Sequence, residues 1–153
     1  QVANDNCPGQ IVISGNVHAL DKAMELASAA GARRPQRLPI SIAAHSPLME
    51  SVAAEYRREV QRHTLVTPYT PVIANTTAAP MLTVEDIYEE LTAQLTSPVR
   101  WRESMLRLLS EGITDFVELG PKDVLTGLLR RIDRSANGHP MCTPAAIAAL
   151  TSA

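Results

Sequence analysis

A histidine on a short turn is the residue of this chain best placed to do chemistry. His45 lies between an apolar segment and the pair Ser46-Pro47. The apolar segment, with isoleucines at 40 and 42, predicts a strand over 38–43. A serine followed by proline is typical of a helix start, with the serine as the N-cap. An imidazole between two such elements can face a cleft and act as a general base, although a lone histidine is more often structural.

The composition is that of a globular protein with a core of ordinary size. The 153 residues are 45% hydrophobic and 20% charged, and the formal net charge is −2. No basic run favours a nucleic-acid partner, and no apolar run approaches the roughly 20 residues that a membrane span needs. Cys7 and Cys142 form no metal-binding pattern. We therefore expect a reduced, cytoplasmic protein without a metal site, a nucleic-acid partner or a membrane segment.

The first third of the chain predicts a hairpin followed by a helix. Short strands at 2–6 and 10–15 flank a Pro-Gly turn, and apolar residues at helical spacing predict a helix over 17–30. With the strand at 38–43, the order β-β-α-β is the last part of a ferredoxin-like βαββαβ unit. We therefore expect the chain to be a fragment in which residues 1–45 form an incomplete ferredoxin-like small subdomain.

The remainder alternates helices with short strands, which favours an α/β layer with parallel strands. Helices are predicted over 46–62, 83–97, 101–112 and 124–132, and strands at 72–75 and 116–119. Thr83 and Asp86 form a capping-box pattern. Residues 133–153 are expected to be a short docked helix or a frayed tail. We interpret residues 46–153 as part of a larger α/β subdomain, with a binding cleft near His45 between the two lobes.

Four segments, in order along the chain, resemble the signatures of malonyl-CoA:acyl carrier protein transacylases. Residues 4–15 read N-D-N-C-P-G-Q-I-V-I-S-G, similar to the family pattern N-x-N-x-P-G-Q-x-V-I-x-G. Residues 44–49 read A-H-S-P-L-M, which resembles the family's histidine motif. Residues 94–101 and 118–128 resemble its C-terminal signatures, with the sequences Q-L-T-S-P-V-R-W and E-L-G-P-K-D-V-L-T-G-L.

This resemblance implies a fold and an activity. The fold would be α/β, part of an α/β-hydrolase-like acyltransferase core together with the incomplete ferredoxin-like subdomain. The activity would be transfer of a malonyl group from coenzyme A to the phosphopantetheine thiol of an acyl carrier protein, in fatty-acid or polyketide synthesis. The coenzyme A thioester is then a substrate, and no separate cofactor is expected.

The resemblance also implies catalytic roles. His45 matches the family's catalytic histidine, which takes the proton of a serine and returns it to the departing thiolate. Gln94 matches the position whose backbone carbonyl accepts the histidine N–H and so fixes the tautomer of the imidazole.

Four further residues are candidates for substrate binding. Asn4 and Asn6 would line the cleft and bind the acyl or pantetheine group; the alternative is that they cap the Pro-Gly turn. Arg33 and Arg34 match basic positions suited to coenzyme A phosphates or to an acidic carrier protein; the alternative is a solvated charge pair.

The nucleophile of the family is not found in this sequence. The family serine stands in a G-H-S-x-G elbow, and no G-x-S-x-G occurs here. The family's glutamine-rich loop and its malonyl-binding arginine are missing as well. We therefore expect the chain to match only the C-terminal half of the enzyme and to be inactive alone. Its partners would be the N-terminal half, which carries the serine, and the acyl carrier protein.

The sequence departs from the family pattern at two places. Residues 120–123 read G-P-K-D where G-P-G-K is usual, and Asp123 is expected to cap the following helix. Ala44 is small, and in related polyketide synthase acyltransferases a small residue there accompanies branched extenders, so malonyl is only the family default.

The alternative functions are an acyltransferase for another acyl-CoA and a non-catalytic carrier-protein-binding module. A pure docking surface would need neither His45 nor the Gln94 segment.

Overall fold

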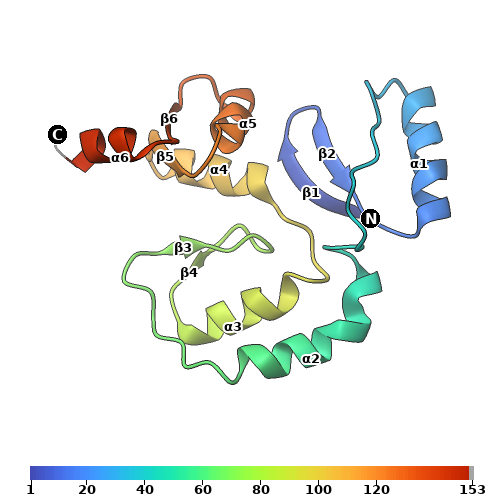
Figure 1. Ribbon diagram of the computed structural model, residues 1–153, viewed down its shortest axis with the longest axis horizontal. Coiled ribbons are helices and arrows are strands. Elements are labelled where there is room, and N and C mark those ends of the chain that lie inside the picture. Colours follow the sequence, from blue (N-terminus) through green and yellow to red (C-terminus); the bar gives the residue numbers. More distant parts are fainter. Residues whose placement is uncertain (152–153) are drawn as a thin grey trace.

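The computed structural model describes residues 1–151, so the last two residues of the predicted subdomain 46–153 lie outside the described residues. In chain order the elements are β1 (Val2–Cys7), β2 (Gln10–Ile13), α1 (Val17–Ala29), the 3₁₀-helix η1 (Pro47–Met49), α2 (Glu50–Val60), β3 (Val72–Ile73), β4 (Pro80–Met81), α3 (Val84–Ala93), α4 (Trp101–Ser110), β5 (Asp115–Leu119), α5 (Val124–Ile132), β6 (Asn137–Met141) and α6 (Pro144–Thr151). β1–β2 and β3–β4 pair antiparallel, and β5–β6 pair parallel (Figure 1).

The N-terminal hairpin and the helix after it are confirmed. Cys7 pairs with Gln10 across the turn, where Gly9 has a φ of 77°. This left-handed conformation carries no steric cost for a residue without Cβ. Asn16 caps α1 by accepting a hydrogen bond from the backbone N–H of His18 at 3.0 Å.

The strand predicted over 38–43 is wrong. The segment is irregular, and the backbone N–H of Ile40 donates to the carbonyl of Leu38 in a tight local turn. Leu38, Ile40 and Ile42 are 46%, 62% and 59% exposed. A strand needs a neighbour for its backbone groups, and among residues 1–151 none pairs with this segment. The expected β-β-α-β order is therefore reduced to β-β-α in the described residues.

The two long helices after His45 form one arm of the molecule. α2 packs against α3, and the short pair β3–β4 lies beside α3 (Figure 1). The predicted capping box is confirmed, because Thr83 Oγ1 accepts from the N–H of Asp86 and the Asp86 carboxylate accepts from the N–H of Thr83. Backbone hydrogen bonds from Leu82 and Thr83 lower the pKa of Asp86 below its ordinary value.

The core lies where α4, α5 and the β5–β6 pair meet. Its buried members are Met105, Leu129 and Ala136, with Trp101, Leu108, Leu109, Phe116 and Ile132 packed around them. Both α4 and α5 also pack against β1, so the N-terminal hairpin is fixed to this core. None of the helices within the described residues has the length and apolarity to cross a membrane.

The C-terminal tail contains a strand that the sequence did not predict. Residues 137–141 read N-G-H-P-M, with few strand-forming side chains, yet they pair with β5 in parallel register. Gly138 is suited to this place because a Cβ there would lie 2.5 Å from Cγ2 of Thr126 on α5. α6 then packs against β6, which confirms a docked helix rather than a frayed end over residues 144–151.

The cap predicted for α5 is also different. Asp123 stands at the N-cap position, but its side chain makes no capping hydrogen bond. The carboxylate of Glu118, at the end of β5, accepts instead from the backbone N–H groups of Leu125 and Thr126 at 2.9 and 2.7 Å. Desolvation opposes ionisation of Glu118, but the hydrogen bonds from these backbone groups outweigh it and lower the pKa of the carboxyl.

Candidate functional site

His45 occupies a strained turn immediately before η1. Its φ is 59°, a left-handed conformation that costs a non-glycine residue of order 1–3 kcal/mol and that is enriched at functional sites. The turn is closed by Ser46, which is buried and whose hydroxyl donates to the carbonyl of Ala43 at 2.7 Å. The predicted side-chain N-cap by Ser46 is therefore wrong, because the hydroxyl stabilises the histidine turn instead.

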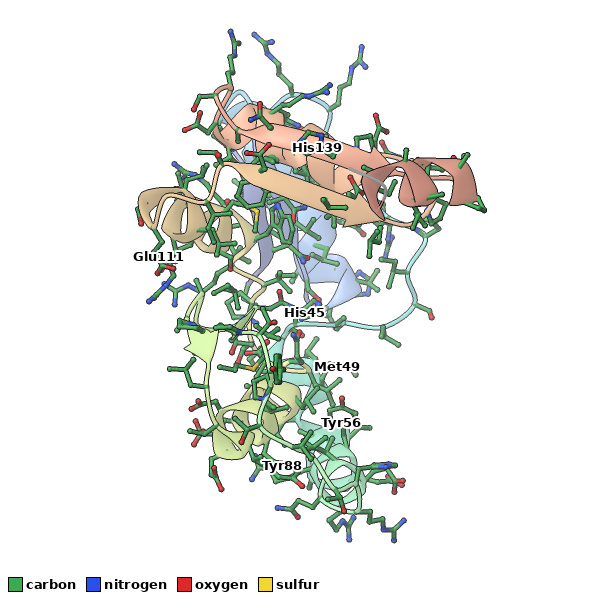
Figure 2. All side chains as sticks on the ribbon, turned by 90° about the vertical axis from the view of Figure 1, so that its left-hand side faces the viewer. His45, Met49, Tyr56, Tyr88, Glu111 and His139 are labelled. Atoms are coloured by element: carbon green, nitrogen blue, oxygen red, sulfur yellow. The ribbon has the colours of Figure 1, made fainter. Side chains whose placement is uncertain are left out.

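The imidazole of His45 is bound to the backbone of Gln94. His45 Nδ1 lies 2.8 Å from the carbonyl oxygen of Gln94, across 49 residues of sequence. A carbonyl oxygen can only accept, so Nδ1 carries the proton, and in the neutral ring Nε2 then holds the free lone pair. In the described residues no protein group bonds to Nε2. Figure 2 shows His45 between the α2–α3 arm and the part of the molecule that carries β5 and β6.

The carbonyl of Gln94 has no competing backbone donor four residues later. An α-helical carbonyl accepts from the N–H at position i+4, and for Gln94 that position is Pro98, which has no N–H. The carbonyl of Ala93, one residue earlier, does accept from the N–H of Ser97 at 2.9 Å. The Gln94 carbonyl is thus one of the carbonyls at the end of α3 that no backbone N–H of the described residues binds, and it accepts from the histidine instead.

The strand β1 lies beside the segment that follows Gln94. Asn4 forms a parallel bridge with Val99. The N–H of Val99 donates to the carbonyl of Ala3 at 2.8 Å, and the carbonyl of Val99 accepts from the N–H of Asp5 at 2.9 Å. The side chain of Gln1 donates to the carbonyls of both His45 and Thr96, so the chain start also joins the two segments. The structure therefore brings His45, Gln94 and Asn4 into one region.

The two asparagines of β1 do not cap the Pro-Gly turn. Asn4 and Asn6 are half-buried, and in the described residues their side chains bond to no group of that turn. Arg131 on α5 holds the turn instead, because its guanidinium donates to the carbonyl of Pro8 at 2.9 Å and to Gln10 Oε1 at 3.3 Å.

Arg33 and Arg34 lie in the loop after α1 and are exposed. In the part of the chain that the structure describes, neither has a side-chain hydrogen bond or an ion pair, and neither is linked in this way to His45 or Gln94. The neighbouring Arg37 does form an ion pair, with Asp21 at 3.6 Å. Arg34 has a φ of 54°.

One charged residue beside this site was not predicted from the sequence. Glu90 is 6% exposed and accepts a hydrogen bond from the side chain of Gln94 at 2.7 Å. The i,i+4 spacing of Glu90 on α3 and Gln94 at its C-cap is a signal that could have found this pair. Residues 1–151 contain no group of three side chains able to hold a metal ion.

The chain is similar to known proteins along almost its whole length. The acyl transferase domain family matches residues 1–148. A malonyl CoA-acyl carrier protein transacylase of Bacillus subtilis is 43% identical over 134 residues, which cover 88% of this chain and 42% of that protein. The transacylase of the same name from Escherichia coli K12 is 35% identical over 146 residues, covering 95% of this chain and 47% of that protein.

Solved structures show the same α/β fold. An acyl carrier protein S-malonyltransferase from Vibrio cholerae matches with a TM-score of 0.94 and 35% identity, over 98% of this chain and 49% of that one. A malonyl-transacylase solved in complex with its type II PKS acyl-carrier protein matches with a TM-score of 0.94 and 32% identity, over 100% of this chain and 50% of that one. The chain thus spans about half the length of these relatives. It belongs to the acyl transferase domain family, as its resemblance to the malonyl-CoA:acyl carrier protein transacylases predicts.

Proposed function

We propose that this chain supplies the histidine of an enzyme that transfers a malonyl group from coenzyme A to an acyl carrier protein. The observation that carries the proposal is the 2.8 Å hydrogen bond from His45 Nδ1 to the carbonyl of Gln94. It holds the imidazole in the tautomer whose Nε2 can accept a proton, which a general base requires. The curated relatives are named malonyl CoA-acyl carrier protein transacylase, which supports the choice of reaction.

In the proposed reaction, His45 moves one proton back and forth. Nε2 takes the proton of a serine hydroxyl as the serine oxygen attacks the thioester carbonyl, and the proton then goes to the departing coenzyme A thiolate. In the second half, Nε2 takes the proton of the phosphopantetheine thiol as the sulfur attacks the acyl-serine. The serine oxygen leaves and recovers that proton, so the histidine ends unchanged.

The serine must come from outside residues 1–153, because the sequence contains no G-x-S-x-G elbow. The relatives are about twice as long as this chain, which supports an N-terminal half that carries the nucleophile. We place residues 1–45 in a small ferredoxin-like subdomain and residues 46–153 in the C-terminal part of an α/β-hydrolase-like core. This chain alone would then be inactive.

The substrate contacts follow from the positions of the polar residues. Asn4 and Asn6 are assigned to the acyl or pantetheine group, since β1 is bonded to the segment after Gln94. Arg33 and Arg34 are assigned to coenzyme A phosphates or to an acidic carrier protein, since their side chains are exposed. The structural relative solved with an acyl-carrier protein supports the choice of partner.

The coenzyme A thioester is the substrate, and no further cofactor is assigned. The free thiols of Cys7 and Cys142 suit a reducing compartment such as the cytoplasm.

The test uses the full polypeptide that carries residues 1–153. Incubation with malonyl-CoA should leave a malonyl adduct on a serine, seen by intact mass and peptide mapping, and adding an acyl carrier protein should remove it. His45→Ala should slow the transfer by about 10²–10⁴-fold, the usual contribution of a general base. A wild-type protein without an adduct would contradict the proposal and favour a non-catalytic carrier-binding module. A faster reaction with a branched acyl-CoA would favour the other acyltransferase, to which the small Ala44 points.

A further inference from the structure

Glu90 is a buried carboxylate one helical turn before Gln94. Its Oε1 accepts from the backbone N–H of Asn75 at 2.8 Å and from Gln94 Nε2 at 2.7 Å. Its Oε2 accepts from the backbone N–H of Thr76 at 3.2 Å and from the Thr76 hydroxyl. Four donors fill the roughly four acceptor positions of a carboxylate, so the burial of this charge is compensated by hydrogen bonds.

One of these donors belongs to the residue that binds the histidine. The side chain of Gln94 bonds to the Glu90 carboxylate, and the N–H of Gln94 donates to the Glu90 carbonyl at 3.0 Å. α3 ends at Ala93, so Gln94 stands at the helix cap, where backbone geometry is less constrained. Two bonds to Glu90 therefore hold the residue whose carbonyl accepts from His45 Nδ1.

The other donors come from the loop after β3. Asn75 binds the carboxylate through its N–H, and its carbonyl accepts from the N–H of Arg100 at 2.8 Å. Arg100 directly precedes α4. Glu90 therefore holds both ends of segment 94–100. It binds Gln94 directly, and it binds Asn75, which in turn binds Arg100.

We propose that Glu90 is a positioning residue for the His45–Gln94 hydrogen bond. It does not touch the imidazole; it fixes the carbonyl to which the imidazole is bound. Two of its four donors are backbone N–H groups, which cannot turn away. Each carboxylate oxygen accepts from one backbone N–H and one side-chain donor, so the NH₂ group of a glutamine at position 90 would face two of the four donors and leave the backbone N–H among them unpaired. The catalytic consequence rests on the proposed function, whereas the effect on the hydrogen bond does not.

The test compares Glu90→Gln with Glu89→Gln in the full polypeptide that carries residues 1–153. Glu89 is the next residue of the same helix, is exposed, and serves as the matched control. In Glu90→Gln we expect kcat for malonyl transfer to fall about tenfold with KM within about twofold, because misplacing a catalytic group affects the chemical step more than binding. In nitrogen-15 NMR spectra, the Nδ1–H signal of His45 should broaden through faster exchange with water. Glu89→Gln should change neither quantity.

Gln94→Ala is the second variant, because it removes the side-chain bond to Glu90 and keeps the backbone carbonyl. Gln94→Ala should also broaden the Nδ1–H signal of His45. It therefore tests the role of Glu90 if Glu90→Gln does not fold. An unchanged Nδ1–H signal in the folded variant would overturn the inference, even if kcat falls. If the wild-type protein transfers no malonyl group, the proposed function fails, and the NMR comparison still decides the role of Glu90.

Discussion

In the described residues one backbone carbonyl orients the imidazole of His45, and Pro98 has no N–H that could compete for that carbonyl. In the proposed function, the hydrogen bond to Gln94 would take the place of the carboxylate that orients the histidine in many catalytic triads. A neutral carbonyl fixes the tautomer without adding a negative charge beside the imidazole. The turn that presents the ring is strained at His45 and closed by the hydroxyl of the buried Ser46.

Replacing Pro98 should weaken this arrangement. Pro98→Ala introduces an N–H at the position that an α-helix would bond to the Gln94 carbonyl. Competition for that oxygen should lower kcat about fivefold, the factor that corresponds to a hydrogen bond of about 1 kcal/mol. Steady-state kinetics of the full polypeptide would measure it, with Pro71→Ala in an exposed loop as the control. Equal kcat values for the two variants would show that the proline is not needed to keep the carbonyl free.

At the scale of elements, α5 is capped by a strand rather than by its own flanking residue. Glu118 at the end of β5 reaches the first turn of α5, where backbone N–H groups and the helix dipole favour a negative charge. β5, α5 and β6 are thereby tied together, because Thr126 on α5 also lies against Gly138 on β6.

This cap predicts a pH-dependent contribution to stability. The pKa of Glu118 is lowered in the folded protein from its ordinary value of 4.5, so its stabilising effect is complete above pH 4.5 and is lost as the pH falls through the lower folded value. Glu118→Gln should therefore lower Tm by roughly 2–4 °C at pH 7 and by less at acid pH. Thermal unfolding between pH 3 and 7 measures this. Asp123→Asn is the control, since Asp123 makes no capping bond; an equal loss of Tm in both variants would contradict the assignment.

At the scale of the whole molecule, the described chain leaves apolar surface uncovered. Leu38, Ile40 and Ile42 are all more than 40% exposed, and the segment that carries them pairs with no strand of residues 1–151. β5 and β6 form a sheet of only two strands there, whereas parallel sheets in proteins are usually larger and covered on both faces. These features fit a chain that spans about half the length of its relatives.

We therefore expect segment 38–43 to be covered in the full polypeptide. Hydrogen exchange followed by mass spectrometry should show amides 38–43 exchanging at least tenfold more slowly than those of 32–36, because covered or paired amides open only rarely. The loop 32–36 is the internal control, since it is mostly exposed in the described structure and carries Arg33 and Arg34. Equally fast exchange in the two segments would show that the apolar residues stay in contact with water.

The sequence by itself determined the features whose signals lie within a few residues of one another. The Pro-Gly turn predicted the hairpin, helical spacing predicted the long helices, and Thr83 with Asp86 predicted a cap that the structure confirms. The four motifs predicted the family. They also paired His45 with the carbonyl of Gln94, which the structure places 2.8 Å from Nδ1, whereas the catalytic roles of the site residues stay predictions.

Only the tertiary structure decided which distant groups meet. Residues 38–43 have a strand-like sequence but no neighbouring strand, whereas residues 137–141 have a poor strand sequence and pair with β5. Glu118 caps α5 in place of Asp123, and Glu90 joins the Asn75 loop to Gln94. The physical reason is the same in each case. Backbone and carboxylate groups bond to whatever donors or acceptors packing brings within 3 Å, and packing depends on the whole chain rather than on the local sequence.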